Sequence, residues 1–330
     1  MSHGTALTET LGIEVPLICG AMYPCSNPEL VAAVSEAGGI GIVQPLSLSY
    51  VHGHDFREGL RYIRTLTDKP IGVNLIIERS SKKYLERVYA WLDIALEEGV
   101  PFLVTALGKP DQVVARTQGA GVTVYHDVTS RRFAEKAFDA GVDGFICVNS
   151  RAGGHAGQLS AAQLLDEIGP LGKPLVCAGG IGTPEDFAAA IGSGYAGAQL
   201  GTRFIATDEC TAHDGYKQAI IAAGADDIVL SEKITGVPVS IIRTPFIARM
   251  GVKAGPLAKW LLRGRRTRHW MRTAYSLQSV WKLRRAALRG MGYRDIYQAG
   301  KSVDGIHAVQ PAAEVVRQYA AALHANSVMQ

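Results

Sequence analysis

The chain has 330 residues, of which 47% are hydrophobic and only 19% are charged, and its mean hydropathy is +0.09. This amount of apolar surface excludes an intrinsically disordered chain, and no apolar run approaches the ~20 residues that cross a bilayer. The first 16 residues lack a basic start followed by an apolar run, which argues against a secretory signal. Five cysteines without a C-x-x-C pair exclude the usual zinc spacing and favour a reduced, cytoplasmic protein.

The formal net charge of +4 is unevenly distributed along the chain. Between Arg243 and Arg294 there are 14 Lys and Arg residues and no Asp or Glu, which leaves 20 basic against 30 acidic residues elsewhere. Such a basic stretch indicates either a partner of opposite charge or a solvated surface.

Eight short apolar runs, most of them rich in β-branched residues, recur through the first 200 residues. Their nearly continuous apolar character predicts the strands of a parallel sheet that is buried on both faces. The runs lie at 15–20, 40–44, 71–75, 102–105, 122–126, 144–148, 174–178 and 197–201.

Amphipathic, mostly Ala-rich segments separate these runs and predict helices. Asn27 and Thr183 each precede a Pro-Glu pair, which predicts that both residues are N-caps with proline in the first turn. Several of the segments end at a glycine just before the next run, as helices commonly do. Clear examples are 28–37, 81–98, 130–140 and 184–193.

Eight strands joined by helical connections predict an α/β fold, a (β/α)₈ TIM barrel. A doubly wound open sheet is the alternative, because a local pattern cannot show closure, but no G-x-G-x-x-G opens the first unit. From about residue 206 the strand rhythm is lost. We therefore predict a barrel over 1–208, an inserted helical, basic cap over 209–295, and a C-terminal segment over 296–330 that packs back on the barrel.

Glycines follow the seventh and eighth predicted strands, where barrels of this kind commonly bind phosphate. Ala178, Gly179 and Gly180 lead into one helix, and Gly201 and Thr202 follow the last strand. Glycine lets backbone N–H groups approach an anion, and a helix N-terminus adds to the attraction. A tight turn into the helix is the alternative explanation, but the two loops together favour a phosphate site more specifically than either alone.

The sixth predicted strand runs into a loop with the sequence Gly153-Gly154-His155-Ala156-Gly157. A histidine among glycines is unlike a packed core histidine, and the strand end places it at the barrel mouth. There His155 can act as a general acid or base, or donate a hydrogen bond to a bound ring. A loop histidine exposed by chance is the alternative.

Other polar or polarisable residues stand at predicted strand ends. Ala21 and Met22 follow the first strand and Asn74 stands near the end of the third, where they either flank a planar cofactor or simply pack. His126 and Asp127 end the fifth strand. Alternation along a strand directs these two side chains to opposite faces, so we expect no His–Asp pair.

Taken in order, these segments resemble the nitronate monooxygenase (2-nitropropane dioxygenase) family, which is related to FMN-dependent enoyl-acyl-carrier-protein reductases and NADH:quinone reductases. The resemblance covers roughly residues 8–245 and a short segment near the C-terminus. The matching segments are 16–22, 28–39, 72–75, 152–157, 178–181, 201–204 and 297–300.

The resemblance implies that the barrel binds FMN, with His155 as the catalytic residue beside the flavin N5 atom. The implied phosphate site is Gly179, Gly180, Gly201 and Thr202, with Ala178 before it. The ring would lie near Ala21, Met22 and Asn74, and Gly153 and Gly154 would let the backbone approach it. One position departs from the pattern: some relatives place a lysine near flavin N1 and O2 where this chain has Asp127.

The resemblance implies that the enzyme oxidises alkyl nitronates with O2 to carbonyl compounds and nitrite. One alternative is an NAD(P)H-dependent reductase of enoyl thioesters or quinones, and another is a flavin-binding or carrier-docking subunit. The basic segment 243–294 suits an acidic carrier protein or an anionic membrane surface, or else a lid that steers anionic substrates. No nucleic-acid-binding motif accompanies it, so we expect no nucleic acid partner.

Overall fold

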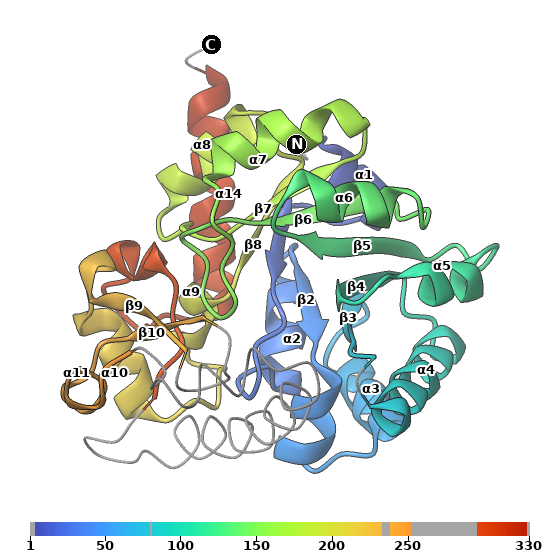
Figure 1. Ribbon diagram of the computed structural model, residues 1–330, viewed down its shortest axis with the longest axis horizontal. Helices are drawn as coiled ribbons and strands as arrows, with labels where there is room; N and C mark the ends of the chain where they lie inside the picture. The colour runs from blue at the N-terminus through green and yellow to red at the C-terminus, as the bar shows by residue number, and fades with distance from the viewer. Residues whose placement is uncertain (1–3, 80, 233–237, 253–295, 329–330) are drawn as a thin grey trace, which may run out of the picture.

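The computed structural model describes residues 4–79, 81–232, 238–252 and 296–328. Eight parallel strands close into a barrel in sequence order, with β1 paired to both β2 and β8 (Figure 1). The predicted (β/α)₈ barrel is therefore confirmed, and the open doubly wound sheet is excluded. The strands are β1 (Leu17–Cys19), β2 (Ile40–Val43), β3 (Ile71–Ile77), β4 (Phe102–Leu107), β5 (Thr123–Val128), β6 (Gly144–Val148), β7 (Leu175–Ala178) and β8 (Gly197–Leu200).

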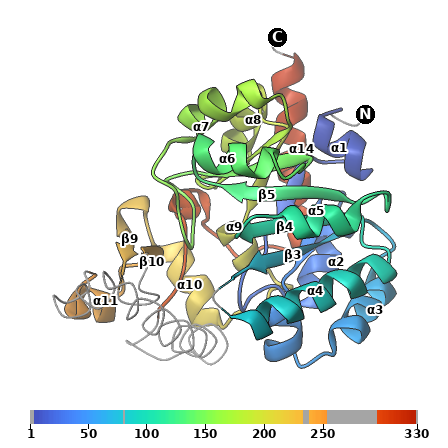
Figure 2. The ribbon, with the colours of Figure 1, turned by 45° about the vertical axis from the view of Figure 1, so that its right-hand side comes forward.

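Helices connect successive strands and form the outer layer of the barrel (Figure 2). Short helical turns extend some connections, namely η1 (Ser47–Val51) and η2 (Gly169–Leu171). The four helices given as clear examples from the sequence are all present. The outer helices are α2 (Pro28–Glu36), α3 (Phe56–Leu66), α4 (Lys82–Glu97), α5 (Asp111–Thr117), α6 (Arg131–Phe138), α7 (Ala161–Ile168), α8 (Pro184–Gly192) and the short α9 (Thr202–Ile205).

The barrel interior is a separate apolar cluster, because alternate residues of each strand face inward. Ile18, Val104 and Tyr125 belong to this cluster. An additional helix, α1 (Ala6–Leu11), closes the amino-terminal end of the barrel with Leu7 and Leu11. The sequence analysis did not predict α1, because six residues are too few to show a helical period.

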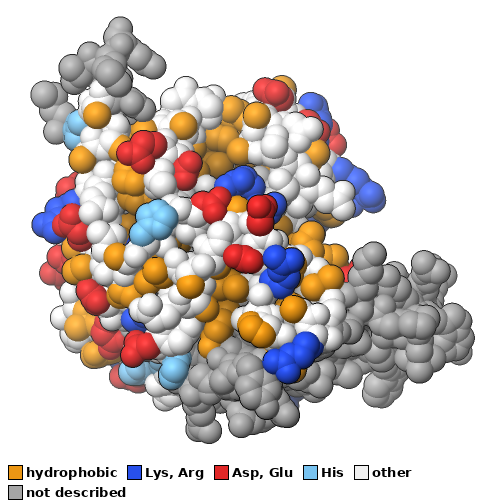
Figure 3. Space-filling model, turned by 90° about the vertical axis from the view of Figure 1, so that its left-hand side faces the viewer, with side chains coloured by type: hydrophobic (Ala, Val, Ile, Leu, Met, Phe, Trp, Pro, Cys, Tyr) orange, Lys and Arg blue, Asp and Glu red, His pale blue; other side chains and the backbone are white. Residues whose placement is uncertain are grey.

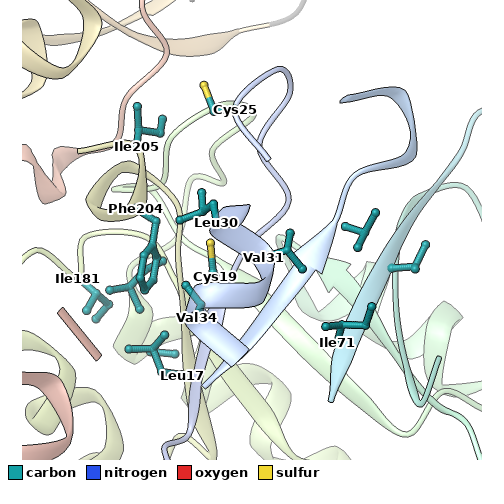
Figure 4. Packing of buried hydrophobic residues seen from close by; sticks show 14 of the residues in the cluster. Leu17, Cys19, Cys25, Leu30, Val31, Val34, Ile71, Ile181, Phe204 and Ile205 are labelled. Carbon is teal, nitrogen blue, oxygen red and sulfur yellow. The ribbon is translucent and has the colours of Figure 1, made fainter. Parts of the chain in front are cut away.

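The second cluster fills the space between the barrel and its helices. Figure 4 shows Leu17 and Cys19 of β1 beside Val34 of α2 and Phe204 of α9. Every one of these side chains is at most 1% exposed. Burying an aliphatic or aromatic side chain contributes about 1.5–3 kcal/mol, so this layer fixes where each strand ends at the mouth.

The two predicted N-caps behave differently. The Thr183 hydroxyl accepts a hydrogen bond from the Asp186 N–H at 3.1 Å in a capping box, as predicted. Asn27 makes no side-chain cap bond. Its amide instead donates to the Glu209 carbonyl at 2.9 Å and accepts from the Thr211 N–H at 3.2 Å, so a long-range tie to the inserted segment replaces the cap.

The inserted segment lies beside the barrel mouth, at the left of Figure 1. Its described part holds α10 (Asp214–Ala222), η3 (Ala225–Asp227), α11 (Pro245–Met250) and an antiparallel pair of strands, β9 (Ile228–Ser231) and β10 (Val239–Ile242). The sequence predicted helices and loops here, so this pair of strands is a correction to the expected helical cap. Both strands have only four residues, and their apolar runs are too short to be distinguished from loop sequence.

The C-terminal segment returns to the barrel, as predicted. It forms η5 (Lys301–Gly305) and α14 (Ala312–Val328), and α14 packs along α8 and α2. The Tyr319 ring contacts Phe187 of α8, and its hydroxyl donates to the Gly182 carbonyl at 2.7 Å. The C-terminal segment thereby supports the loop that follows β7.

The surface carries charges of both signs. On the face shown in Figure 3, acidic and basic side chains are interspersed with apolar ones. Most of the basic segment 243–294 lies outside the described residues, so its expected carrier or membrane contact stays a prediction. Within the described ranges, no helix has the length and apolar character to span a bilayer.

Candidate functional site

Loops from three strands and from the C-terminal segment meet at the carboxyl-terminal end of the barrel. The Gly300 N–H donates to the Thr202 hydroxyl at 3.0 Å, and the Lys301 N–H donates to the Arg151 carbonyl at 2.9 Å. A β-carbon added at Gly153 would lie 3.0 Å from the Gly300 nitrogen. The loop after β6, the start of α9 and residues 300–301 are therefore in direct contact.

The loop after β7 needs glycine at two successive positions. Gly179 and Gly180 have φ values of +113° and +79°, which L side chains rarely adopt. A β-carbon on Gly179 would also lie 2.6 Å from the Ala152 nitrogen. Gly179 is therefore required for packing the β6 and β7 loops, which accounts for part of the glycine pattern without any ligand.

Gly201 is different, because packing does not require it to be glycine. Its φ is −112°, and an added β-carbon would meet only Met22, with the Sδ atom at 3.5 Å. This is an ordinary van der Waals contact, so the protein itself leaves room above Gly201. The fold thus brings Met22 and Gly201 together.

The same loops hold N–H groups that no protein atom uses. Among the described residues, the N–H groups of Gly180, Ile181 and Thr202 donate to no other protein atom. The N–H groups of Gly182 and Thr183, by contrast, are both taken by the Asp186 carboxylate, at 2.9 and 3.0 Å. The available donors therefore sit on the β7 and β8 loops, where a phosphate group would satisfy them.

Asn74 is buried in the barrel wall. Its amide donates to the Val104 carbonyl at 3.2 Å, which fixes the side chain on the inward face. Ala178 ends β7 and is also buried, as part of the interior cluster, and Ala21 packs against that cluster. Asn74 and Ala21 thus lie on the interior face of the mouth, whereas Met22 packs against the outer cluster.

His155 is exposed on the loop after β6, whose backbone is held from the inserted segment. The Ser240 N–H of β10 donates to the Gly154 carbonyl at 2.8 Å, forming an isolated bridge. Gly154 itself has a φ of +66°. Although part of the side chain is exposed, the surrounding atoms partly desolvate the imidazole and lower its pKa below the usual 6.5, so His155 is neutral at pH 7.

His126 and Asp127 face opposite sides of β5, as expected. The His126 Nδ1 atom lies 2.8 Å from the Thr105 hydroxyl in the buried layer outside the barrel. Burial lowers the pKa of His126 to about 4, so its ring is a neutral structural group. Asp127 faces the interior, and burial raises its pKa to about 7.

Two contributors to the site were missed from sequence. Ser240 and Gly300 reach the His155 loop from residues far along the chain, through backbone contacts that any residue type can make. No local motif marks Ser240. The segment containing Gly300 had been noted only for its family resemblance.

The residues present fit a flavin mononucleotide. The unused N–H donors suit a single phosphate, and the open space above Gly201 suits a close approach by the cofactor. Asp127 Oδ1 is buried with no hydrogen-bond partner among the described residues, so the mouth also holds an unsatisfied polar atom that a bound group can satisfy.

Comparison with known proteins agrees with this geometry. Residues 4–321 match the profile of the nitronate monooxygenase family. The chain is 32% identical to a 5-hydroxy-7a-methyl-1-oxo-octahydro-1H-indene-4-carboxyl-CoA dehydrogenase of Rhodococcus jostii, over 74% of this chain and 67% of the relative. It is 31% identical to a probable nitronate monooxygenase of Staphylococcus saprophyticus, over 76% and 81% of the two chains. FabK from Thermotoga maritima superposes with a TM-score of 0.82 at 27% identity, over 99% of this chain and 98% of that one.

Proposed function

Because the chain belongs to the nitronate monooxygenase family, whose members are flavoproteins, we propose that it is an FMN-dependent oxidoreductase with His155 as its catalytic residue. The observation that carries this proposal is the meeting of the β6, β7 and β8 loops around unused N–H donors, with His155 on the first of them. When bound, FMN supplies a reversible acceptor of two electrons.

The protein's own groups have separate tasks. The N–H groups of Gly180, Ile181 and Thr202 would bind the phosphate, and Met22 and Asn74 would flank the ring. Burial lowers the pKa of His155, so the imidazole is neutral at pH 7 and is suited to take a proton from a substrate. Its exposure at the mouth keeps it within reach of an incoming substrate.

Two reactions are candidates for this site. Oxidation of alkyl nitronates by O2 to carbonyl compounds and nitrite is favoured by the family profile and by the 31% identical Staphylococcus relative. Flavin-dependent oxidation or reduction of a thioester is favoured by two relatives, at 32% and 30% identity, that are named as dehydrogenases of an indene-carboxyl-CoA. In either case His155 handles the substrate's proton.

Reconstitution followed by anaerobic reduction tests the proposal. The purified protein should take up one FMN and no FAD, and the bound flavin should bleach with its physiological donor. Bleaching by ethyl nitronate alone identifies the monooxygenase, and bleaching by NADH, NADPH or a saturated thioester identifies the second reaction. A protein that takes up no FMN, or that prefers FAD, would contradict the proposed function.

A further inference from the structure

Asp127 is the one carboxylate on the barrel wall. The eight strands contain no Lys or Arg, and among their side chains Asp127 is the only Asp or Glu. It follows Tyr125 by two residues, and Tyr125 belongs to the interior cluster. Val124 and Val128, on the opposite face, belong to the outer cluster. Asp127 therefore faces the interior at the carboxyl end of β5, where a substrate of the proposed flavin site would enter.

The carboxyl group has no compensating partner. Its Oδ1 atom is buried and makes no hydrogen bond to any described residue. A bare, buried carboxylate oxygen is costly, whereas a protonated carboxyl group can donate one hydrogen bond to a bound acceptor. Desolvation is accordingly what raises the Asp127 pKa to about 7, and no cation among the described residues lowers it.

The other ionisable groups on the strands and helix packed against β5 do not account for a titration near neutral pH. On β5, burial raises the pKa of Tyr125 and lowers that of His126 to about 4, and on β6 burial raises the pKa of the Cys147 thiol. His155 is neutral above pH 6.5. β4 carries no ionisable side chain, and the charged residues of α6 are exposed on the outer surface, namely Arg131, Arg132, Glu135 and Lys136.

We propose that Asp127 selects substrates by charge: the protonated carboxyl group donates a hydrogen bond to a neutral carbonyl ligand such as a thioester, and the ionised group repels nitronates and other anions. This inference rests on the proposed flavin site and favours the second of its two reactions. A lysine at this position would have the opposite effect, because a cation attracts an anionic substrate.

The expected dependence on pH follows from the charges. An anion that binds only when Asp127 is protonated should lose about tenfold in affinity per pH unit above the Asp127 pKa. The loss of affinity should level off near a thousandfold. This limit corresponds to the repulsion between two unit charges about 4 Å apart at an effective dielectric constant of about 20. A neutral ligand should lose only the few-fold contribution of one hydrogen bond.

Crotonate and crotonamide are a matched pair of probes, since they have nearly the same shape but differ in charge. Their dissociation constants are measured between pH 7 and pH 9 from the change in absorbance of bound FMN, so no turnover is needed. Asp127→Asn keeps the shape and removes the charge. Asp143→Asn is the control, because Asp143 accepts from the Val124 N–H at 2.8 Å at the opposite end of β5.

The wild-type protein and Asp143→Asn should bind crotonate about ten- to a hundredfold more weakly at pH 9 than at pH 7, while crotonamide changes only a few-fold. In Asp127→Asn, the affinity for crotonate should be independent of pH. The same pH dependence in Asp127→Asn and wild type, pH-independent crotonate binding in wild type, or a failure of crotonamide to bind would overturn the proposal. Each of those results leaves FMN uptake, and hence the proposed function, unaffected.

Discussion

Substituting Gly201 by alanine tests whether a glycine is needed at this position for binding the cofactor and not for folding. In the protein alone, the new methyl group would touch only Met22, at 3.5 Å, and the backbone φ of −112° accepts an L side chain. We therefore expect the apoprotein to unfold at nearly the wild-type temperature. If FMN approaches the Gly201 backbone, the methyl group occupies space that the cofactor needs.

Overpacking by one methyl group typically costs about 1–3 kcal/mol, which corresponds to a roughly 5- to 150-fold weaker affinity for FMN. Quenching of FMN fluorescence measures the affinity, and thermal unfolding of the apoprotein measures stability. Gly192→Ala in α8 is the matched control, since nothing lies within 4 Å of its added β-carbon. Wild-type affinity for FMN in the Gly201 variant would refute the placement of the cofactor at this loop.

Three further outcomes are expected. The His155→Ala variant should retain FMN and lose about 10²–10⁴-fold in turnover rate. The His155→Asn variant should recover part of that rate only if the imidazole acts as a hydrogen-bond donor. Near-normal turnover in the Ala variant would end the catalytic assignment. The Leu107→Gly substitution should raise the free energy of unfolding by up to about 1 kcal/mol, because Leu107 has a φ of +72°, which is strained for an L side chain, and its side chain is 66% exposed. Chemical denaturation measures this change, and a loss of stability would contradict the prediction. For Asp127, a folded-state pKa of about 7 against an ordinary 3.8 means that stability is lost as pH rises between these values. The Asp127→Asn substitution should therefore raise the free energy of unfolding by up to about 4 kcal/mol at pH 8 and by little at pH 4. Denaturation curves of the apoprotein measure this, and equal gains at both pH values would argue against burial as the cause.

The barrel could be predicted because its strands are buried on both faces. Each strand is then a nearly continuous apolar run, and the run survives even where glycine interrupts it, as at Gly41 and Gly72. The pair β9–β10 could not be found in the same way. A two-stranded ribbon beside the mouth has one open face, and Leu230 in its first strand is 53% exposed.

The tight turn after β7 could be predicted because its requirement is local. Gly179 and Gly180 adopt positive φ in the same tight turn, and the sequence shows both glycines together. The support of His155 was not predictable, since it comes from backbone contacts to Ser240 and Gly300 across the fold. A backbone N–H leaves no signature in the identity of the residue that carries it.

The direction of Asp127 illustrates what a strand pattern can and cannot decide. Alternation requires that His126 and Asp127 face opposite sides of β5, but it does not say which of them faces the interior. That choice depends on the pairing of Tyr125 with Gly144, since a β-carbon on Gly144 would lie 2.4 Å from the Tyr125 ring and only glycine leaves room for it. A shift of one residue would exchange the two faces and place a neutral histidine at the mouth. The identity of the side chain that faces the mouth on β5 therefore depends on a glycine at the other end of the barrel, on a strand that carries neither residue.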